Sequence, residues 1–142
     1  MPAPRVGQTD LQQLLTGIDP ALDDEIYTFC TVTRDARGAH STPADCICTF
    51  DEREGRTLIL PLDSARRGGL DHLGEWAKIT LQIHSSLEAV GFIATIATAL
   101  AHDGISANVM SGYYHDHVFV PWARRHDAVD AIRRVALEAG AA

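Results

Sequence analysis

The segment from Trp76 to His84, W-A-K-I-T-L-Q-I-H, constrains the fold most, because polar and apolar side chains alternate along it. The apolar set is Ile79, Leu81 and Ile83, and the polar set is Lys78, Thr80, Gln82 and His84. A repeat of two residues is that of a β-strand with one buried face. A chain with such a strand must cover the apolar face of the strand with other elements.

A helix is predicted directly after this strand. Ser85-Ser86-Leu87-Glu88 matches a capping box, in which a serine oxygen and a glutamate satisfy free N–H groups of the first helical turn. Gly104 is typical of the position that follows the end of a helix. Between these ends, apolar residues recur at helical spacing: Leu87, Val90, Ile93, Ala94, Ala97, Leu100 and Ala101.

The remaining segments complete an α+β pattern. Residues 105–111 and 117–120 are predicted strands joined by a turn, and a helix follows over about 124–138. The first half contains a short helix after Asp10, strands at 25–33, 46–50 and 57–61, and a short helix that ends at paired glycines. This order favours antiparallel sheets with helices on one face.

The second half, read as β-α-β-β-α, is one strand short of a common module. The ferredoxin-like module is β-α-β-β-α-β, and its last strand is missing here. We therefore expect a strand from the first half to complete the sheet of the second, so that two modules are intertwined.

Charge and cysteine content limit the partners of the chain. The formal net charge is −7, from 19 acidic and 12 basic residues, which provides no basic stripe for nucleic acid. No segment approaches the length of a membrane span, and the N-terminus has no apolar leader. We expect a cytoplasmic protein with no nucleic-acid or membrane partner. Cys30, Cys46 and Cys48 are expected to be reduced, buried thiols.

Two segments of the second half resemble an ACT domain: residues 84–109, H-S-S-L-E-A-V-G-F-I-A-T-I-A-T-A-L-A-H-D-G-I-S-A-N-V, and residues 111–121, S-G-Y-Y-H-D-H-V-F-V-P. With Y-T-F-C-T-V and E-G-R-T-L-I-L-P in the first half, the chain resembles small bacterial stand-alone proteins with paired ACT domains. The architecture is also similar to that of cytosolic arginine sensors in animals.

The resemblance implies a fold and a function. The fold is α+β, with two ferredoxin-like ACT modules over residues 8–72 and 73–142. The implied function is non-enzymatic, regulatory binding of a small ligand, most often an amino acid, without a cofactor. ACT sheets tend to pair edge to edge, so the resemblance also implies a homodimer.

A ligand site is expected at the junction between the predicted strand and helix. Free N–H groups at a helix start suit a carboxylate. In ACT domains the matching loop commonly holds the ligand, and this resemblance assigns Ser85, Ser86, Val90 and Gly91 to the site. The alternative is that the serines only cap the helix and that Gly91 only permits close packing.

The hairpin supplies the second part of the expected site. Asp116 is placed to pair with a ligand ammonium or guanidinium group, and the related sensors have a similar acidic residue in this hairpin. The alternative is an aspartate that only accepts a hydrogen bond from its own turn. Tyr114 and His115 are predicted to form a wall of the same pocket.

Two other functions stay open. His115 and His117 are two residues apart and would share one face of a strand, as metal ligands do, so the chain is also interpretable as a metal-binding protein or a metal-dependent enzyme. A protein–protein interaction module without a ligand is the third possibility. The sequence contains no nucleophile elbow, Walker loop or dinucleotide-binding turn, and no catalytic residue is assigned.

Overall fold

The computed structural model describes residue 7 and residues 9–38 and 41–141. The chain packs into two compact units. The larger unit comprises Met1–Asp23 and Ala77–Ala142, and the smaller unit comprises Asp24–Trp76. These units reflect packing, whereas the predicted boundary between residues 72 and 73 separates sequence modules, and that boundary stays a prediction.

The larger unit contains the completed sheet that the sequence predicted. The strand order in it is β1-β4-β6-β5, where β4 is His72–Leu81, β5 is Asn108–Ser111 and β6 is Asp116–Pro121. The outer strand is the beginning of β1 (Pro20–Val32), from the first half of the chain. The Gln82 amide donates to the carbonyl oxygen of Asp19 at 3.0 Å, and Lys78 Nζ lies 3.2 Å from Asp23 Oδ2. Residue numbers therefore rise along β1 as they fall along β4, so the two strands are antiparallel.

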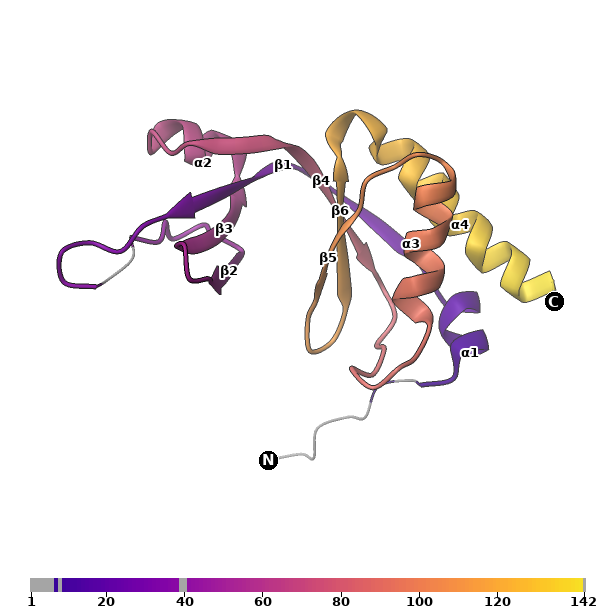
Figure 1. The fold of residues 1–142 in the computed structure, drawn as a ribbon. Coiled ribbons are helices and arrows are strands. Elements are labelled where there is room, and N and C mark those ends of the chain that lie inside the picture. The colour runs from indigo at the N-terminus through magenta and orange to yellow at the C-terminus, as the bar shows by residue number, and fades with distance from the viewer. Residues whose placement is uncertain (1–6, 8, 39–40, 142) are drawn as a thin grey trace. The chain divides into compact units, whose positions relative to one another are not determined.

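Three helices pack around the core of the larger unit. Figure 1 shows α3 (Phe92–His102) and α4 (Arg125–Ala141) side by side on one face of the sheet. The short helix α1 (Leu11–Thr16) packs against α4, and a 3-10 turn, η1 (Trp122–Arg124), leads into α4. In the second half of β4, every second residue is buried under these helices: Ala77, Ile79 and Leu81. The predicted alternation is confirmed for Ile79 and Leu81, whereas Ile83 lies beyond the end of β4 and is half-buried. The predicted placement of the helices on one face is confirmed.

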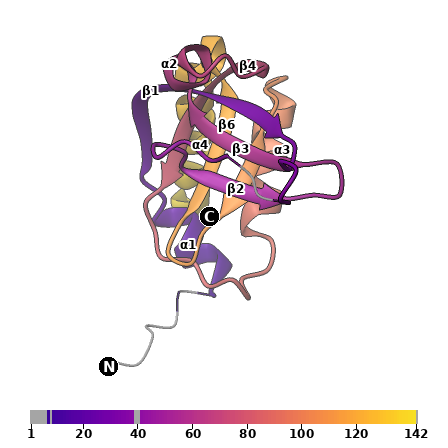
Figure 2. The same cartoon turned by 90° about the vertical axis from the view of Figure 1, so that its left-hand side faces the viewer.

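The smaller unit has the strand order β2-β3-β1-β4. Figure 2 shows β2 (Cys48–Asp51) beside β3 (Arg56–Pro61), from which the chain enters α2 (Leu62–Arg67). Thr28 Oγ1 on β1 donates to the carbonyl oxygen of Gly74 on β4 at 2.7 Å. The core of this unit is small and consists of Cys30, Leu58, Leu60 and Ala65.

The connection from β1 to β2 in the smaller unit differs from that of a full β-α-β-β-α-β module. Its described residues, 33–38 and 41–47, contain no helix. A ferredoxin-like module has its first helix at this point. In the larger unit, the corresponding connection contains α3.

The expectation of buried thiols holds for one cysteine only. All three cysteines are free; Cys30 is buried, whereas Cys46 and Cys48 are half-buried. Cys48 belongs to β2, the edge strand of its sheet, so one side of that strand has no neighbour to cover it. Burial is the main cause that raises the pKa of the Cys30 thiol.

The predicted start of the central helix is wrong. α3 begins at Phe92 rather than near Leu87, and no side chain caps its first turn. Ser86 Oγ accepts instead from the Glu88 amide at 3.1 Å, and the Ala89 amide donates to the Ser86 carbonyl oxygen at 3.0 Å. These bonds close a turn, so residues 82–91 form a longer loop than the capping-box pattern predicted.

Candidate ligand site

The loop after β4 and the start of β6 are joined by one buried hydrogen bond. Ser85 Oγ donates to Asp116 Oδ2 at 2.9 Å, across 31 residues of sequence. Both residues are only 6% exposed. Among the described residues, no other hydrogen bond and no ion pair reaches the carboxylate of Asp116. Burial of a carboxylate without a cationic partner is unfavourable, so a cationic group placed beside Asp116 would stabilise it.

A cavity of about 170 Å³ lies against this carboxylate. Its walls come from the loop, the start of α3 and the hairpin of β5 and β6: Ser86, Leu87, Ala89, Gly91, Phe92, Ile93, Ala94, Ser111 and Asp116. By volume it has room for on the order of five water molecules, which is the size of a small metabolite. All of these walls belong to the larger unit.

The start of α3 gives the cavity a positive end. The first N–H groups of a helix have no partner within the helix, and the helix dipole adds partial positive charge there. Phe92, Ile93 and Ala94 are the first residues of α3 and line the cavity, and no side chain caps this helix. The cavity therefore has hydrogen-bond donors on one side and the carboxylate of Asp116 on another.

Gly91 sets the direction in which the chain enters α3. Its φ is 89°, in the left-handed region that favours glycine over residues with a Cβ atom. A Cβ atom at this position would also lie 3.4 Å from Leu11 Cδ2. Gly91 thus permits both the sharp turn before α3 and the close approach of α1.

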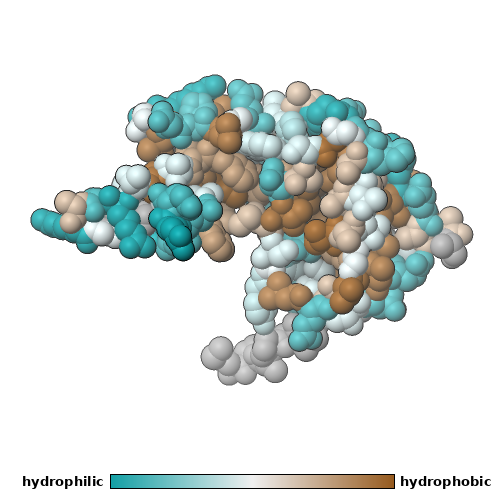
Figure 3. Space-filling model, viewed as in Figure 1, coloured by the Kyte–Doolittle hydropathy of each residue, from teal (hydrophilic) through white to brown (hydrophobic). Residues whose placement is uncertain are grey.

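The structure brings together four of the seven residues predicted for the site. Ser86, Gly91 and Asp116 line the cavity, and Ser85 binds Asp116. Val90 is 84% exposed and is not a lining residue. Val90 is one of several apolar side chains that are exposed. Figure 3 shows such apolar regions, in brown, on the surface of the larger unit.

The two predicted residues of the hairpin loop lie outside this cavity. The Gly112 amide donates to the carbonyl oxygen of His115 at 2.8 Å and closes the turn. The ring of Tyr114 packs against His84, with 5.4 Å between ring centroids, and against Tyr113 at 4.9 Å. Tyr114 therefore packs against His84, in the loop after β4, and does not line the cavity.

Sequence reasoning did not identify Ser111 or the first residues of α3 as parts of the cavity. Ser111 is the register partner of Asp116 across the hairpin. The signal that could have placed Ser111 beside Asp116 is the predicted hairpin of residues 105–111 and 117–120. Phe92, Ile93 and Ala94 were missed because the helix was predicted to start earlier.

The histidine pair does not have the geometry that the metal interpretation requires. β6 begins at Asp116, so His115 lies in the turn and does not share a strand face with His117. Among the described residues, no three His, Cys, Asp or Glu side chains form a group able to hold a metal ion. His117 Nδ1 lies 3.0 Å from Thr80 Oγ1, and burial, followed by nearby Lys78 and His115, lowers the pKa of His117.

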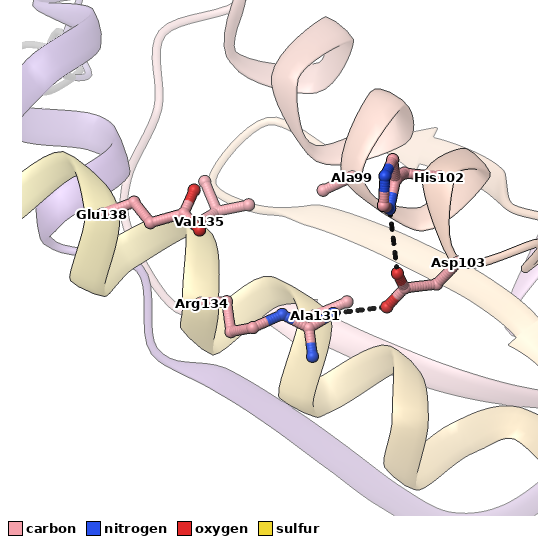
Figure 4. Close-up of a pocket in the computed structure, with 7 residues that line it drawn as sticks. All are labelled: Ala99, His102, Asp103, Ala131, Arg134, Val135 and Glu138. Carbon is pink, nitrogen blue, oxygen red and sulfur yellow. Dashed lines mark hydrogen bonds and ion pairs between the residues drawn. The ribbon is translucent and has the colours of Figure 1, made fainter.

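A second cavity, of about 450 Å³, lies between α3 and α4 (Figure 4). Figure 4 shows His102 and Arg134 pointing toward Asp103, which pairs with both of them. Hydrogen bonds from His102 and Arg134 lower the pKa of Asp103. The carboxylate of Asp103 is thus paired with two cationic side chains, whereas no ion pair reaches that of Asp116 within the described part of the chain. The second cavity is therefore the weaker candidate for a ligand cation.

Comparison with known families identifies the class of protein. Two models of the ACT domain family match the chain, one over residues 6–76 and one over residues 74–134. The chain belongs to the ACT domain family and contains two ACT domains in tandem. The predicted α+β fold with ferredoxin-like modules is confirmed, because ACT domains have that fold.

Solved structures agree with this assignment. A protein of unknown function from Vibrio cholerae, described as a possible transport protein, is 42% identical; the match covers 89% of this chain and 95% of that one, with a TM-score of 0.78. The regulatory subunit of aspartate kinase from Thermus flavus is 13% identical over 84% of this chain and 98% of that one, with a TM-score of 0.61. Aspartate kinase of Clostridium acetobutylicum is 11% identical over 96% of this chain and 37% of that one, also with a TM-score of 0.61.

At such low identity, the two aspartate kinase matches show the fold alone. A search of curated protein sequences gave no match. No helix in the described part of the chain is long and apolar enough to cross a membrane.

Proposed function

We propose that this chain is a non-enzymatic regulatory protein that binds one small amino acid in the cavity beside Asp116. The observation that carries the proposal is the buried carboxylate of Asp116, whose hydrogen-bond partner is a neutral hydroxyl and which faces the same cavity as the start of α3. An α-amino acid carries an ammonium and a carboxylate group a few bonds apart. The ammonium would pair with Asp116, and the carboxylate would accept hydrogen bonds from the first amides of α3.

The family assignment supports a regulatory role. Two of the similar structures are a regulatory subunit of aspartate kinase and an aspartate kinase described as an allosteric enzyme for the production of amino acids. We propose that ligand binding to these ACT domains regulates a partner protein. We also propose that the chain forms a homodimer, in which the edge strand β5 of the larger unit pairs with its copy. Sedimentation of the full chain measures that state directly.

A thermal-shift screen of the purified chain against the common amino acids tests the proposal. A ligand at about 100 times its Kd stabilises a protein by about 2.7 kcal/mol, so the Tm should rise by several degrees with at least one amino acid. Asp116→Asn should abolish this rise. Asp130→Asn is the matched control, because Asp130 is exposed on α4, away from the cavity.

Two outcomes would contradict the proposal. One is the absence of a Tm rise with any amino acid at millimolar concentration. The other is stabilisation by a divalent metal ion that disappears in His117→Ala, since that result would favour the metal-binding alternative.

A further inference from the structure

The two hairpins of the chain have the same register, with residue numbers that differ by sixty throughout. β2 pairs with β3 from Cys48↔Ile59 to Asp51↔Arg56. β5 pairs with β6 from Asn108↔Phe119 to Ser111↔Asp116. The second strand of each hairpin ends at a proline that leads into a helical turn: β3 ends at Pro61 and β6 at Pro121. Arg56 therefore occupies in the smaller unit the position that Asp116 occupies in the larger one.

The turns of the hairpins confirm this equivalence. The Glu52 amide donates to the Gly55 carbonyl oxygen at 2.9 Å, and the Gly112 amide donates to the His115 carbonyl oxygen at 2.8 Å. The two hydrogen bonds are again sixty residues apart. The equivalence thus rests on the backbone of both hairpins as well as on the strand register.

The chemistry at the equivalent position is reversed. Arg56 carries a guanidinium where Asp116 carries a carboxylate, and its charge is already paired. Arg56 Nε lies 2.6 Å from Asp51 Oδ1, and its Nη2 lies 3.2 Å from Asp51 Oδ2, so the contact is bidentate. Arg56 Nη1 also donates to Thr42 Oγ1 at 3.2 Å. Asp51 in turn occupies the position of Ser111, which lines the cavity of the larger unit.

The donors that a helix start supplies to a ligand carboxylate are also absent from the equivalent connection of the smaller unit, over its described residues. In the larger unit they come from the start of α3, which follows the first strand of the module. The equivalent connection in the smaller unit, over its described residues 33–38 and 41–47, contains no helix. In the larger unit, the features that fit a zwitterion are a helix start and a carboxylate with no cationic partner among the described residues. The described residues of the smaller unit have neither feature at the equivalent positions.

We infer that the chain has one amino-acid site and that the pair of Arg56 and Asp51 occupies the second, equivalent position. This inference rests on the proposed function. A ligand ammonium would be repelled by the guanidinium of Arg56, and the same guanidinium already binds a carboxylate of the chain itself. The position of Arg56 then contributes no contact to an amino-acid ligand, and one such ligand binds each chain.

Isothermal titration calorimetry of the full chain tests the inference, with each amino acid that raises its Tm as the titrant. We expect one mole of ligand per mole of chain. Arg56→Gln should leave the stoichiometry unchanged and the Kd within about twofold, whereas Asp116→Asn should weaken binding at least tenfold, the loss expected for a charged hydrogen bond. Circular dichroism of each variant checks that it is folded.

The outcomes separate the inference from the proposed function. A stoichiometry of two, reduced to one by Arg56→Gln, would overturn the inference and leave the proposed function intact. Loss of all binding in Arg56→Gln with unchanged binding in Asp116→Asn would overturn the inference and move the site to the smaller unit. If no amino acid gives a heat of binding, the proposed function and the inference both fail.

Discussion

Asp116 is the residue on which the account of the site depends. It is buried, it starts β6, and it accepts a hydrogen bond from Ser85. A structural carboxylate is usually surrounded by donors or cations, because its burial is otherwise unfavourable. Among the described residues, the one hydrogen-bond donor to the Asp116 carboxylate is the neutral Ser85 hydroxyl, which is consistent with the proposed role of Asp116 in binding a ligand cation.

The first prediction concerns the effect of this carboxylate on the stability of the ligand-free protein. Asp116→Asn removes a buried charge but keeps an oxygen that can accept from Ser85. The Tm of the ligand-free variant should therefore equal or exceed that of the parent, although ligand binding is lost. Differential scanning calorimetry without ligand measures this. A fall in Tm of many degrees would instead show that Asp116 is part of the structural framework.

The second prediction concerns Gly91. Gly91→Ala places a Cβ atom at a φ of 89°, and a left-handed conformation costs about 1–2 kcal/mol for such a residue. We expect a lower free energy of unfolding by about that amount and weaker ligand binding, since the start of α3 must shift. Urea denaturation measures the change.

A second glycine provides the control with the opposite sign. Gly140 lies within α4, where an added Cβ atom would meet only Thr16 Cγ2 at 3.9 Å. Gly140→Ala should leave stability unchanged or raise it by up to about 1 kcal/mol, because alanine favours a helix. Equal losses in both variants would contradict the role given to the conformation of Gly91.

Strand β4 was predicted well from its sequence, whereas the start of helix α3, which follows it, was not. The alternation of side chains was enough to predict β4, because burial of one sheet face repeats every second residue. The structure buries Ala77, Ile79 and Leu81. The capping-box pattern did not predict the start of α3, because its serines form hydrogen bonds elsewhere. The Ser85 hydroxyl binds Asp116, a residue far away in sequence, and Ser86 closes a local turn. A local pattern cannot report a partner supplied by the tertiary fold.

A third prediction tests the true helix caps. Asp10 accepts from the Gln13 amide at 2.9 Å and is the N-cap of α1. Asp10→Ala should lower the free energy of unfolding by about 1 kcal/mol. Ser86→Ala should change it by less than about 0.5 kcal/mol, because Ser86 lies in an exposed turn and caps no helix. Urea denaturation of the two variants compares them, and a larger loss for Ser86→Ala would restore the capping-box interpretation.

For the whole molecule, the sequence predicted that strands would be exchanged between the halves, and the larger unit shows this. Its sheet is completed by Pro20–Asp23 from the start of β1, and α1 packs against α4. The incomplete β-α-β-β-α order of the second half was the signal. The cavity could not be predicted in the same way, since its walls depend on where α3 begins and on a contact between segments 31 residues apart.

The fourth prediction follows from this exchange. A fragment of residues 73–142 lacks the outer strand Pro20–Asp23 and helix α1, which belong to the same compact unit. The fragment should expose the side of β4 that pairs with β1 and should show no cooperative unfolding transition in urea. The full chain should unfold cooperatively under the same conditions. A cooperative transition of the fragment would show that the sequence module, and not the packing unit, is the unit of folding.

The central claim is that the ligand lies between Asp116 and the start of α3. The most direct measurement is an amide chemical-shift titration of the isotopically labelled full chain with an amino acid that raises its Tm. We expect the largest chemical-shift changes at residues that line the cavity: Ser86, Asp116 and the first residues of α3, Phe92 to Ala94. Shifts confined to the second cavity, around Asp103 and Arg134, or to the hairpin at Asp51 and Arg56, would contradict it.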